Sequence, residues 1–547
     1  MRRDLEELTG RRFDLLVVGG GIHGLFAAYE AASRGLSVAL VEASDFGSGA
    51  TFNHQRTLHG GMRALQSGNL IKTRRQIGER RTWAIIAPHL VRPLPFLVGT
   101  YRLSRRSRVV LRAGFALYDR LGRRRNAGVS PELHLPRARL ESRATTRAFF
   151  PGIRDEGLTG GAVWYDYQTR HPERLTLCVA LAASGAGATV VNHAEAVAPL
   201  RANGRVIGCR VRDRLTGTER DVEATVTLLA AGGRLESVQA IFGAGGAPPV
   251  LHAVNVLIDR PARDIALAAT SASGRMLTAV PWAGKLLVGT YQSPEPARSS
   301  ETEAPDAAVA ELLADANSAF PALAASRRDV LLVHHGLTPA VVRSGRADLM
   351  PEPQVIRHGA KGVPGLVSLI GVKYTTARLA ARQAVEAAAA ELGARLGPSR
   401  TATEALPHAG IADAEGRLVE RLRELGVDLD PDVQTHLTGW YGTEAPAVAS
   451  HAAGAGGLER LSPGSPVLCG ELSYATSHGG ACRLSDVVLR RTPLAAAGHP
   501  GAAVLRRAAA VLQPAVGWSA AEIATEIAAI DGAFQRGRQP AGAPTEP

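Results

Sequence analysis

Glycines near the amino terminus are spaced as in loops that bind the phosphates of a dinucleotide. Residues 19–24 read GGGIHG and fit the pattern GxGxxG. Gly19 would allow a tight turn, Gly21 would let the backbone approach a pyrophosphate, and Gly24 would let a helix pack closely on a strand. The amino terminus of that helix would add amide donors and the positive end of a dipole. Taken alone the motif is weak, because a glycine-rich run can also be a simple turn.

The elements around the glycines strengthen this interpretation. Phe13–Val18 has the apolar composition of a buried strand, Gly24–Ser33 is Ala-rich and favours a helix, and Ser37–Glu42 is a second buried strand. Together they form a βαβ unit of the expected size. Glu42 ends the second strand 23 residues after Gly19, where a carboxylate can bind the ribose hydroxyls of an adenosine. The sequence therefore predicts dinucleotide binding.

Three later segments favour FAD over NAD. Asp45–Leu65 is a long, polar, glycine-rich loop, and Leu228–Gly233 places small residues after an apolar strand. Gly365–Lys373 then offers a strand, a glycine and a lysine directly before a long helix at Thr375–Leu396, whose amino terminus can face a flavin carbonyl. In this interpretation three later segments come back to contact one large cofactor. Such repeated contact is more typical of FAD than of NAD.

Composition limits the other classes of function. A chain of 547 residues predicts two or three domains, and 45% hydrophobic and 21% charged residues are ordinary for a globular protein. No apolar run reaches the roughly 18–20 residues of a membrane span, and Met1–Arg12 is charged, so a cytoplasmic protein is expected. The four cysteines form no CxxC pair, which argues against a disulfide framework, a metal site or an iron–sulfur cluster.

The net charge of +13 concentrates in one segment. Tyr101–Arg125 holds nine arginines against the single acid Asp119, with apolar residues between them. A basic amphipathic helix of this kind favours an anionic membrane surface, and a solvated helix packed on the protein is the alternative. Nucleic acid is the least supported partner, because interleaved aromatics and known binding motifs are missing from the sequence.

The chain resembles the FAD-dependent, aerobic-type glycerol-3-phosphate dehydrogenases, within the D-amino-acid-oxidase-like flavoproteins. The pieces that carry the resemblance span nearly the whole chain in order: DLLVVGGGIHG, RGLSVALVEASDF, LHGGMRAL, ERRTWAIIAPHLVRPLPF, LYDRLGRR, VPWAGKLLVGT, GVKYTTARLA, ELSYA and DVVLRRTPL. The resemblance implies oxidation of a secondary alcohol, with hydride transfer to flavin N5 and a quinone as the electron acceptor. It also implies an α/β fold with a discontinuous Rossmann-type FAD-binding domain, a mixed-sheet substrate domain and a C-terminal α-helical domain.

The resemblance also implies a set of site residues. Arg63 of HGGMR and Lys373 of GVKYTT would line the substrate side of the flavin, and Arg357 of VIRHG would lie near the substrate phosphate. Where the family has a histidine as the base, this chain has Asn255, which cannot act as one. Thr338 stands where the family has a phosphate-binding arginine. The implied cofactor contacts are Gly19, Gly21, Ile22, His23, Gly24, Glu42, Ala43, Ser48, Thr51, His59, Gly60, Gly61, Val197, Gly232, Gly371, Lys373 and Thr375.

The two substitutions leave alternatives open. The chain could oxidise a different hydroxy or amino compound, or bind flavin without catalysis, although the retained Arg63 and Lys373 count against the latter. His252, three residues before Asn255, would face the opposite side of a strand, so His334 and His335 are the other candidates for the base, although a lone histidine is more often structural. Peripheral attachment to the inner face of the cell membrane and a homodimer are further expectations.

The expected domains are 1–12 as an extension, 13–100, 155–240 and 340–396 for FAD, 101–154 as a basic helical insertion, 241–339 for substrate, 401–534 as a helical domain, and 535–547 as a disordered tail.

Overall fold

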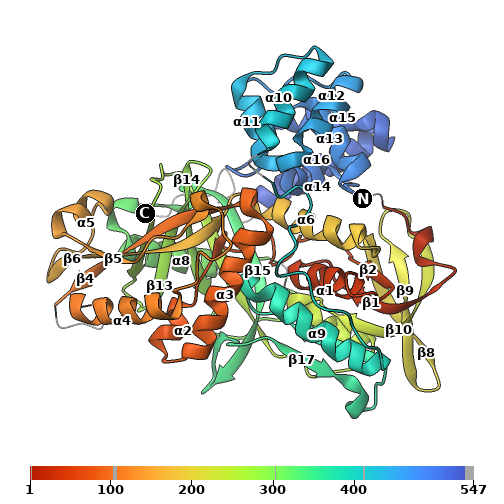
Figure 1. Cartoon of the computed structure of the whole chain (residues 1–547), viewed down its shortest axis with the longest axis horizontal. Coiled ribbons are helices and arrows are strands. Elements are labelled where there is room, and N and C mark those ends of the chain that lie inside the picture. The colour runs from red at the N-terminus through yellow and green to blue at the C-terminus, as the bar shows by residue number, and fades with distance from the viewer. Residues whose placement is uncertain (2, 103–106, 302, 411–412, 536–547) are drawn as a thin grey trace, which may run out of the picture.

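The computed structural model describes residues 1, 3–102, 107–301, 303–410 and 413–535. Two α/β parts lie side by side, each built on its own β-sheet, and a helical domain from the C-terminal part of the chain lies across both of them (Figure 1). The expected architecture of an FAD-type α/β domain, a mixed-sheet domain and a helical domain is thereby confirmed. The expectation of a disordered tail concerns residues that, from 536 onward, lie outside the described ones.

The first sheet contains the predicted βαβ unit. β1 (Arg12–Val18) pairs in parallel with β2 (Val38–Val41), and α1 (Ile22–Ala32) connects the two strands. Leu15, Leu16 and Val17 are all fully buried, so β1 is covered on both faces. A strand buried on both faces needs a continuous apolar run, which is why this segment shows no alternation of polar and apolar residues.

The rest of the first sheet comes from distant parts of the chain. The strand order is β17-β18-β10-β1-β2-β7, with β9 and β8 continuing from β10 as an antiparallel pair. The carboxyl ends of β1, β10 and β18 meet at one edge because these three strands run in parallel. The further bounds are β7 Thr189–Val191, β8 Ala194–Ala202, β9 Arg205–Asp213, β10 Glu219–Leu229, β17 Gln354–Arg357 and β18 Leu366–Ile370.

Helices cover one face of this sheet. α6 (Pro172–Gly185) and α9 (Ala377–Leu392) both pack on α1, and the small residues of the three helices share one core with β1 and β2. Alanines dominate these contacts, so the helix axes can come close together. α9 begins directly after the carboxyl end of β18, as the sequence predicts.

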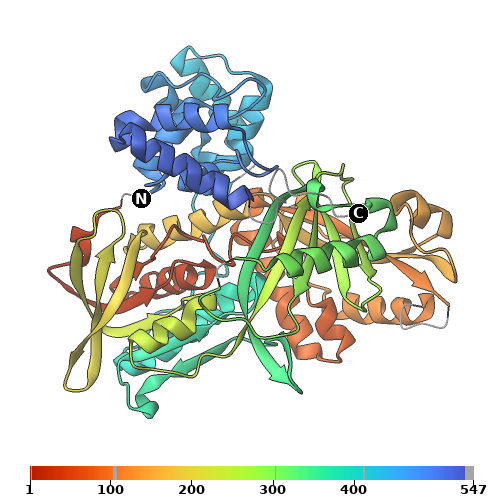
Figure 2. The same cartoon turned by 180° about the vertical axis from the view of Figure 1, so that it is seen from behind.

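The second sheet has the strand order β16-β15-β11-β14-β13-β12-β4-β6-β3, with β5 at the side of β6. α8 (Asp306–Ala319) packs on β11, β13 and β14 and crosses the sheet when the molecule is seen from behind (Figure 2). The strands are β3 Thr57–Leu58, β4 Val91–Tyr101, β5 Arg139–Glu141, β6 Leu158–Thr169, β11 Val250–Ile258, β12 Ala266–Thr270, β13 Met276–Trp282, β14 Lys285–Gln292, β15 Val330–Arg343 and β16 Arg346–Leu349. β3, β4 and β6 fall in ranges expected for the FAD-binding domain, yet they pair into this sheet.

The arginine-rich segment forms α4 (Arg108–Leu121), while Arg105 and Arg106 lie outside the described residues. The sequence predicts an amphipathic helix with a single apolar side. In the structure the apolar residues of α4 lie on two different sides of the helix. Phe115 is buried and packs on the second sheet, whereas Val109 is 79% exposed and Val110 is 51% exposed. Helical periodicity places Val109 and Val110 away from Phe115, so they are free to face a partner.

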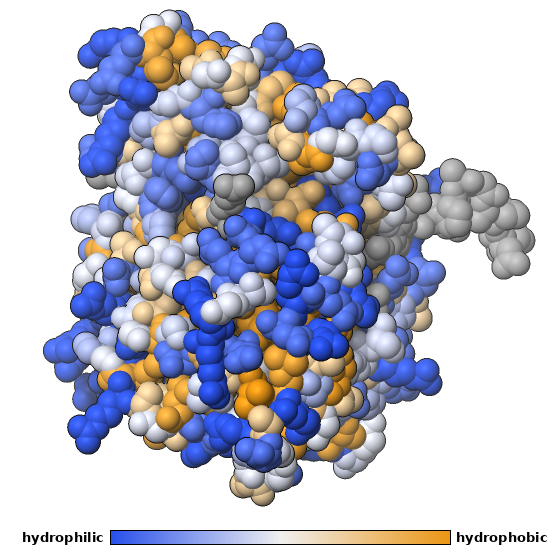
Figure 3. Space-filling model, turned by 90° about the vertical axis from the view of Figure 1, so that its right-hand side faces the viewer, coloured by the Kyte–Doolittle hydropathy of each residue, from blue (hydrophilic) through white to orange (hydrophobic). Residues whose placement is uncertain are grey.

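The C-terminal domain is entirely helical. Its helices are α10 Ala414–Leu425, α11 Pro431–Tyr441, α12 Ala445–Gly454, α13 Cys469–His478, α14 Leu484–Asp486, α15 Ala502–Val516 and α16 Ala520–Gln535. On the side where this domain, the β8–β9 hairpin and α9 are seen together, hydrophilic residues are spread among hydrophobic ones (Figure 3). None of the helices in the described ranges combines the length and low polarity that crossing a membrane requires.

Candidate functional site

The glycine-rich loop lies between the carboxyl ends of β1 and β10. Gly19 has φ +114°, and a Cβ at this position would lie 2.6 Å from the carbonyl oxygen of Ala230, so only glycine fits there. A Cβ at Gly24 would overlap the carbonyl oxygen of Gly19, so Gly24 sets the close packing of α1 on β1. Gly21 precedes the first turn of α1, and its neighbour Ile22 is buried. The loop has the geometry that the GxGxxG pattern predicts.

Two side chains face the backbone donors of this loop. Glu42, at the end of β2, accepts a hydrogen bond from Gly20 N at 2.6 Å, and Thr51 Oγ1 accepts one from Ile22 N at 3.1 Å. Burial raises the pKa of Glu42, while the hydrogen bonds from Gly20 and Ser44 oppose that shift. Both predicted contact residues therefore adjoin the glycine loop, and Ala43 and Ser48 belong to the turn that connects them.

His23 and Gly371 bring α1 and the end of β18 together. A Cβ at Gly371 would overlap the imidazole of His23. Burial lowers the pKa of His23 to about 4, so the ring is neutral, and its Nε2 atom is buried without a hydrogen-bond partner in the protein. An unpaired buried nitrogen is costly unless a ligand satisfies it. Together with the glycine loop, this nitrogen fits a large polar cofactor such as FAD.

The loop His59–Gly61, called the HGG loop below, is held by a buried acid. His59 Nδ1 lies 3.0 Å from Asp166 Oδ2, and Gly60 N donates to Asp166 Oδ1 at 2.8 Å. Arg80 forms a buried ion pair with the same carboxylate. Burial alone would raise the pKa of Asp166, but Arg80 and His59 hold that pKa below its ordinary value. Asp166 is therefore ionised and fixes the loop.

The HGG loop also contacts the start of α9. His59 N donates to Thr375 Oγ1 at 3.2 Å, which places the two predicted contact residues side by side. Tyr118 OH of α4 donates to the Gly60 carbonyl oxygen at 3.0 Å. A Cβ at Gly61 would lie 2.8 Å from Oε1 of Gln76, so this glycine permits a close approach of α3 (Leu70–Ile86). The loop thus connects the start of α9, which the sequence predicts to face the flavin, with α3 and α4.

Basic side chains surround a cavity next to Lys373. The cavity has a volume of about 170 Å³, and its lining includes Arg75, Gln76, Glu352 and Lys373. Burial, together with the charges of Lys72, Arg63 and Arg75, lowers the pKa of Lys373 to about 8. Arg63 is therefore near enough to Lys373 for their charges to interact, and the role of both on the substrate side of the flavin stays a prediction.

One acid partly balances these cations. Lys72 Nζ lies 3.0 Å from Glu352 Oε1, and Arg75 forms a second ion pair with the same carboxylate. The cavity lining thus contains two cations, Arg75 and Lys373, and one acid, Glu352, while Lys72 pairs with that acid and Arg63 lies near enough to Lys373 to act on its charge. The excess positive charge suits an anionic ligand.

Arg357 does not join this group, contrary to the sequence-based expectation. β17 pairs antiparallel with β18 so that Arg357 lies opposite Val367, near the amino-terminal end of β18, whereas Lys373 follows the other end. The Arg357 side chain is half-exposed and forms an ion pair with Glu391 of α9 at 3.2 Å. The strand register, which the sequence does not reveal, carries this arginine away from the site.

Asn255 lies in a separate polar group on the second sheet. Its Oδ1 accepts from Thr290 Oγ1 at 2.7 Å, and its Nδ2 donates to the Asn53 carbonyl oxygen at 3.1 Å. His334 is its direct neighbour on β15, and burial and Arg56 hold the pKa of His334 well below the ordinary value. Thr338 lies further along the same face of β15, and its buried Oγ1 has no partner.

Two predicted cofactor contacts remain. Val197 lies in β8 at an irregularity between Ala196 and Ala198, and it is partly buried. Gly232, with φ +56°, begins the short helical turn after β10, at the same sheet edge as Gly19. Gly232 thus lies at the edge where the glycine loop lies, and contact of Val197 with the cofactor stays a prediction.

Asp166, Lys72 and Arg75 were not among the residues predicted from the sequence. Asp166 lies on β6 more than a hundred residues after the HGG loop, so no local pattern connects the two. Lys72 and Arg75 are three residues apart on α3, and that spacing places them on one helix face. Helical periodicity could have grouped these two cations, but it could not have placed them beside Lys373.

Comparisons with known proteins agree with this site. The family model of FAD dependent oxidoreductases matches residues 14–387, and the model of the C-terminal domain of alpha-glycerophosphate oxidase matches residues 401–523. Glycerol-3-phosphate dehydrogenase of Mycobacterium leprae (strain TN) is 33% identical over 96% of this chain and 88% of its own length. The protein of that name from Synechocystis sp. is 29% identical over 90% of this chain and 91% of its own length.

The fold has a solved counterpart. The X-ray structure of the glycerol-3-phosphate dehydrogenase from Bacillus halodurans, complexed with FAD, superimposes with a TM-score of 0.74 and covers 99% of this chain and 98% of its own, at 23% identity. The glycine loop, the acid at the end of β2 and the unpaired His23 nitrogen fit the cofactor that the family model names. The chain therefore belongs to the FAD dependent oxidoreductases and, within them, to the glycerol-3-phosphate dehydrogenase family.

Proposed function

We propose that this enzyme oxidises the secondary alcohol of glycerol 3-phosphate to the ketone of dihydroxyacetone phosphate. The relatives that share about a third of its residues carry that substrate in their names. FAD, when bound, supplies the acceptor for the hydride that leaves the alcohol carbon. The protein must then bind a phosphate, take up the hydroxyl proton and exclude water.

The observation that carries this proposal is the basic cavity beside Lys373. A phosphomonoester carries nearly two negative charges at neutral pH, and an unpaired buried anion is very costly. Arg75 and Lys373 of the cavity lining, with Lys72 and Arg63 nearby, supply the opposite charge, and Glu352 is the one acid of that lining. Position 338, where the family has a phosphate-binding arginine, offers only the hydroxyl of Thr338. In this proposal the cations at the cavity take over the role of that arginine.

We propose that His59 is the base that accepts the proton of the substrate hydroxyl. Because the ionised Asp166 can only accept hydrogen bonds, it holds the proton on His59 Nδ1 and leaves the lone pair on Nε2. The His59 side chain is 51% exposed, so a substrate can reach it. Thr57 Oγ1, at 2.9 Å from Nε2, can donate to that lone pair until a substrate hydroxyl replaces it. Asn255 would then have no role as a base.

A test of the proposal is anaerobic reduction of the bound flavin. Glycerol 3-phosphate should bleach the flavin rapidly and glycerol should not. Arg75→Gln should raise KM for glycerol 3-phosphate about 10–100-fold, the equivalent of one charge-assisted hydrogen bond of about 1.5–3 kcal/mol. Arg74→Gln, on the same helix but outside the cavity lining, is the matched control, and Arg357→Ala should also leave KM unchanged.

Thr338 and Asn255 support a second candidate, the oxidation of a different hydroxy or amino compound. The buried, unpaired Thr338 Oγ1 could donate to or accept from an uncharged group, which an arginine would not favour. Bleaching by a neutral polyol or an amine, with no bleaching by glycerol 3-phosphate, would establish this alternative and exclude the first.

We further propose that the enzyme attaches peripherally to an anionic membrane and passes electrons to a quinone there. Leu70 and Ile71 at the start of α3, with Val109 and Val110 at the start of α4, are exposed apolar residues on two neighbouring helices. Exposed arginines lie along α4 and directly after it: Arg112, Arg120, Arg123 and Arg124. Apolar residues within a basic surface are the combination that interfacial helices use.

A further inference from the structure

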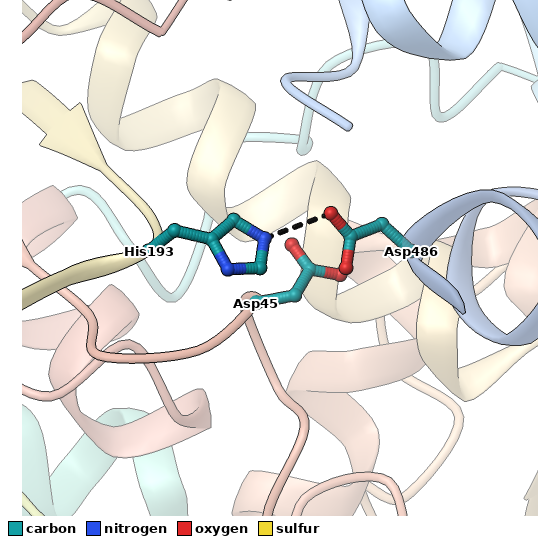
Figure 4. A group of neighbouring side chains, drawn as sticks. All are labelled: Asp45, His193 and Asp486. Carbon is teal, nitrogen blue, oxygen red and sulfur yellow. Dashed lines mark hydrogen bonds and ion pairs between the residues drawn. The ribbon is translucent and has the colours of Figure 1, made fainter. Parts of the chain in front are cut away.

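A buried cluster of charges joins the FAD-binding domain to the helical domain. Asp45 follows β2, His193 precedes β8, and Asp486 ends α14, and their side chains point toward one another (Figure 4). Arg490 and Arg491, in the helical turn after Asp486, complete what is called the interdomain cluster below. The side chains of Asp45 and Asp486 are fully buried.

The cluster is an ion-pair network. Arg491 binds Asp45 in bidentate fashion, with Nη1–Oδ2 at 2.8 Å and Nη2–Oδ1 at 2.7 Å. Arg490 bridges both acids, because its Nε lies 2.5 Å from Asp45 Oδ2 and its Nη2 lies 2.9 Å from Asp486 Oδ1. Two guanidinium groups thus balance two carboxylates.

This balance bears on metal binding. Ligand atoms of Asp45, His193 and Asp486 lie within 4.8 Å of one another, which is close enough to hold an ion. The positive charge that a metal would bring is, however, already supplied by Arg490 and Arg491. His193 Nε2 in turn lies 2.9 Å from Asp486 Oδ2. We therefore interpret the cluster as a set of ion pairs that joins the two domains, and not as a metal site.

Asp45 belongs to the turn that carries predicted cofactor contacts. Glu42 and Ser48 flank it, and Gly47 N donates to the Gly20 carbonyl oxygen at 2.9 Å, so the turn is tied directly to the glycine loop. On its other side, Asn192 Nδ2 donates to Asp45 Oδ1 at 3.0 Å. The carboxylate of Asp45 points to the helical domain while the backbone of its turn contacts the glycine loop. A movement of Arg491 would therefore displace the turn.

We propose that the helical domain controls how tightly FAD is held, by fixing the turn at residues 42–48 through the bidentate pair of Arg491 and Asp45. Asp45, Arg490 and Arg491 are positioning residues in this account, since none of them is a predicted FAD contact. The inference rests on the FAD-binding family of the chain and not on the identity of the substrate.

The energetics favour a specific effect. Removing Arg491 leaves Arg490 as the one guanidinium of the cluster for two buried carboxylates, and removing the charge of Asp45 leaves two guanidinium groups for one carboxylate. Either excess of buried charge is strongly unfavourable. In Arg491→Met the turn can relieve this cost by moving Asp45 toward solvent, and in Asp45→Asn the turn loses its charged link to Arg491. Glu42 would move with the turn in both variants. The expected result in Asp45→Asn or Arg491→Met is a rise of at least about 10-fold in the FAD dissociation constant, equivalent to about 1.4 kcal/mol.

A matched control comes from a second buried ion pair between the same two domains. Arg174 of α6 pairs with Glu444 of the helical domain, and neither residue belongs to the turn at 42–48. Arg174→Met or Glu444→Gln therefore weakens the domain interface without removing an ion pair of the cofactor turn. Each full-length holoenzyme is diluted at a temperature where circular dichroism shows it folded, and the release of flavin is followed by fluorescence.

The outcomes decide the proposal. FAD release from Asp45→Asn and Arg491→Met but not from the control variants, with partial rescue in Arg491→Lys, supports it. With excess FAD the variants should regain kcat, and KM for the substrate should equal that of the wild type. Equal release from the control variants, or tight FAD in Asp45→Asn, would overturn it. If Asp45→Asn does not fold, the comparison of Arg491→Lys with Glu444→Gln decides.

Discussion

Nδ1 of His59 lies 3.0 Å from Oδ2 of Asp166, and the same carboxylate accepts a hydrogen bond from the backbone of Gly60. The acid therefore orients both the imidazole and the loop that the resemblance places against the flavin. This relationship joins a loop after the first βαβ unit to a strand of the second sheet. It makes His59 a better candidate for the base than Asn255, which has no lone pair of suitable basicity.

His59→Gln should lower kcat by about 10²–10⁴-fold, the usual contribution of a general base, while FAD stays bound. Asp166→Asn should act in the same direction, because an amide can donate to Nδ1 and favour the wrong tautomer. The rate of flavin bleaching in stopped-flow experiments measures both effects. His499 and Asp531 form a similar pair at 2.8 Å in the helical domain, so His499→Gln serves as the control. A rate in His59→Gln equal to that of the wild type would refute the assignment.

The lowered pKa of Lys373 predicts a pH dependence of substrate binding. Because burial and neighbouring cations bring that pKa to about 8, the ammonium loses its proton as the pH rises through this value. KM for the phosphorylated substrate should therefore rise above pH 8 and stay level below it. In Lys373→Arg the guanidinium remains charged, so the rise should vanish. An unchanged KM profile in that variant would exclude Lys373 from the anion site.

Gly24→Ala should both destabilise the protein and weaken FAD binding. The added Cβ overlaps the Gly19 carbonyl oxygen, and overpacking of this kind typically costs about 1–3 kcal/mol. Thermal unfolding and flavin content measure the two effects. Gly78 lies in the middle of α3, where a Cβ would meet no atom within 4 Å, so Gly78→Ala should stabilise the protein by about 0.5–1 kcal/mol. Full flavin content in Gly24→Ala would contradict the role of this glycine.

Membrane attachment should depend on the charges of the α4 region. Replacing Arg112, Arg120, Arg123 and Arg124 by Gln should weaken binding to anionic vesicles by about 1 kcal/mol per charge, and high salt should have the same effect. Co-sedimentation with vesicles measures the binding. The control is the exchange of Arg417 and Arg423 on α10, in the helical domain. Wild-type protein that does not bind anionic vesicles at low salt would rule out this proposal.

Local patterns predicted the first βαβ unit well. Apolar strands, an Ala-rich helix and the glycine spacing are encoded within about thirty residues, and Glu42 does lie beside Gly20. The returns at Leu228–Gly233 and Gly365–Lys373 were also predicted, because glycines that follow apolar strands mark sheet edges in a parallel α/β fold.

Strand register and long-range partners were beyond such patterns. Arg357 seemed close to the site from its motif, yet its pairing with Val367 places it at the far end of β18. Asp166 could not be linked to His59, since only the pairing of β3 with β6 brings their strands together. For the same reason the pairing of β4 with β6 and β12 in the second sheet could not be predicted: an apolar strand does not reveal its neighbours.

The separation of β1, β10 and β18 along the chain also governs the order of events during synthesis. A nascent chain that ends before Leu366 contains the glycine loop but lacks β18, Gly371 and the start of α9. Parallel strands so distant in sequence pair late, because the entropy of closing the long intervening loops must be overcome first. Capture of the flavin therefore follows the synthesis of β18 and the start of α9, and until then the edge of β10 that pairs with β18 is a surface that a chaperone would need to shield.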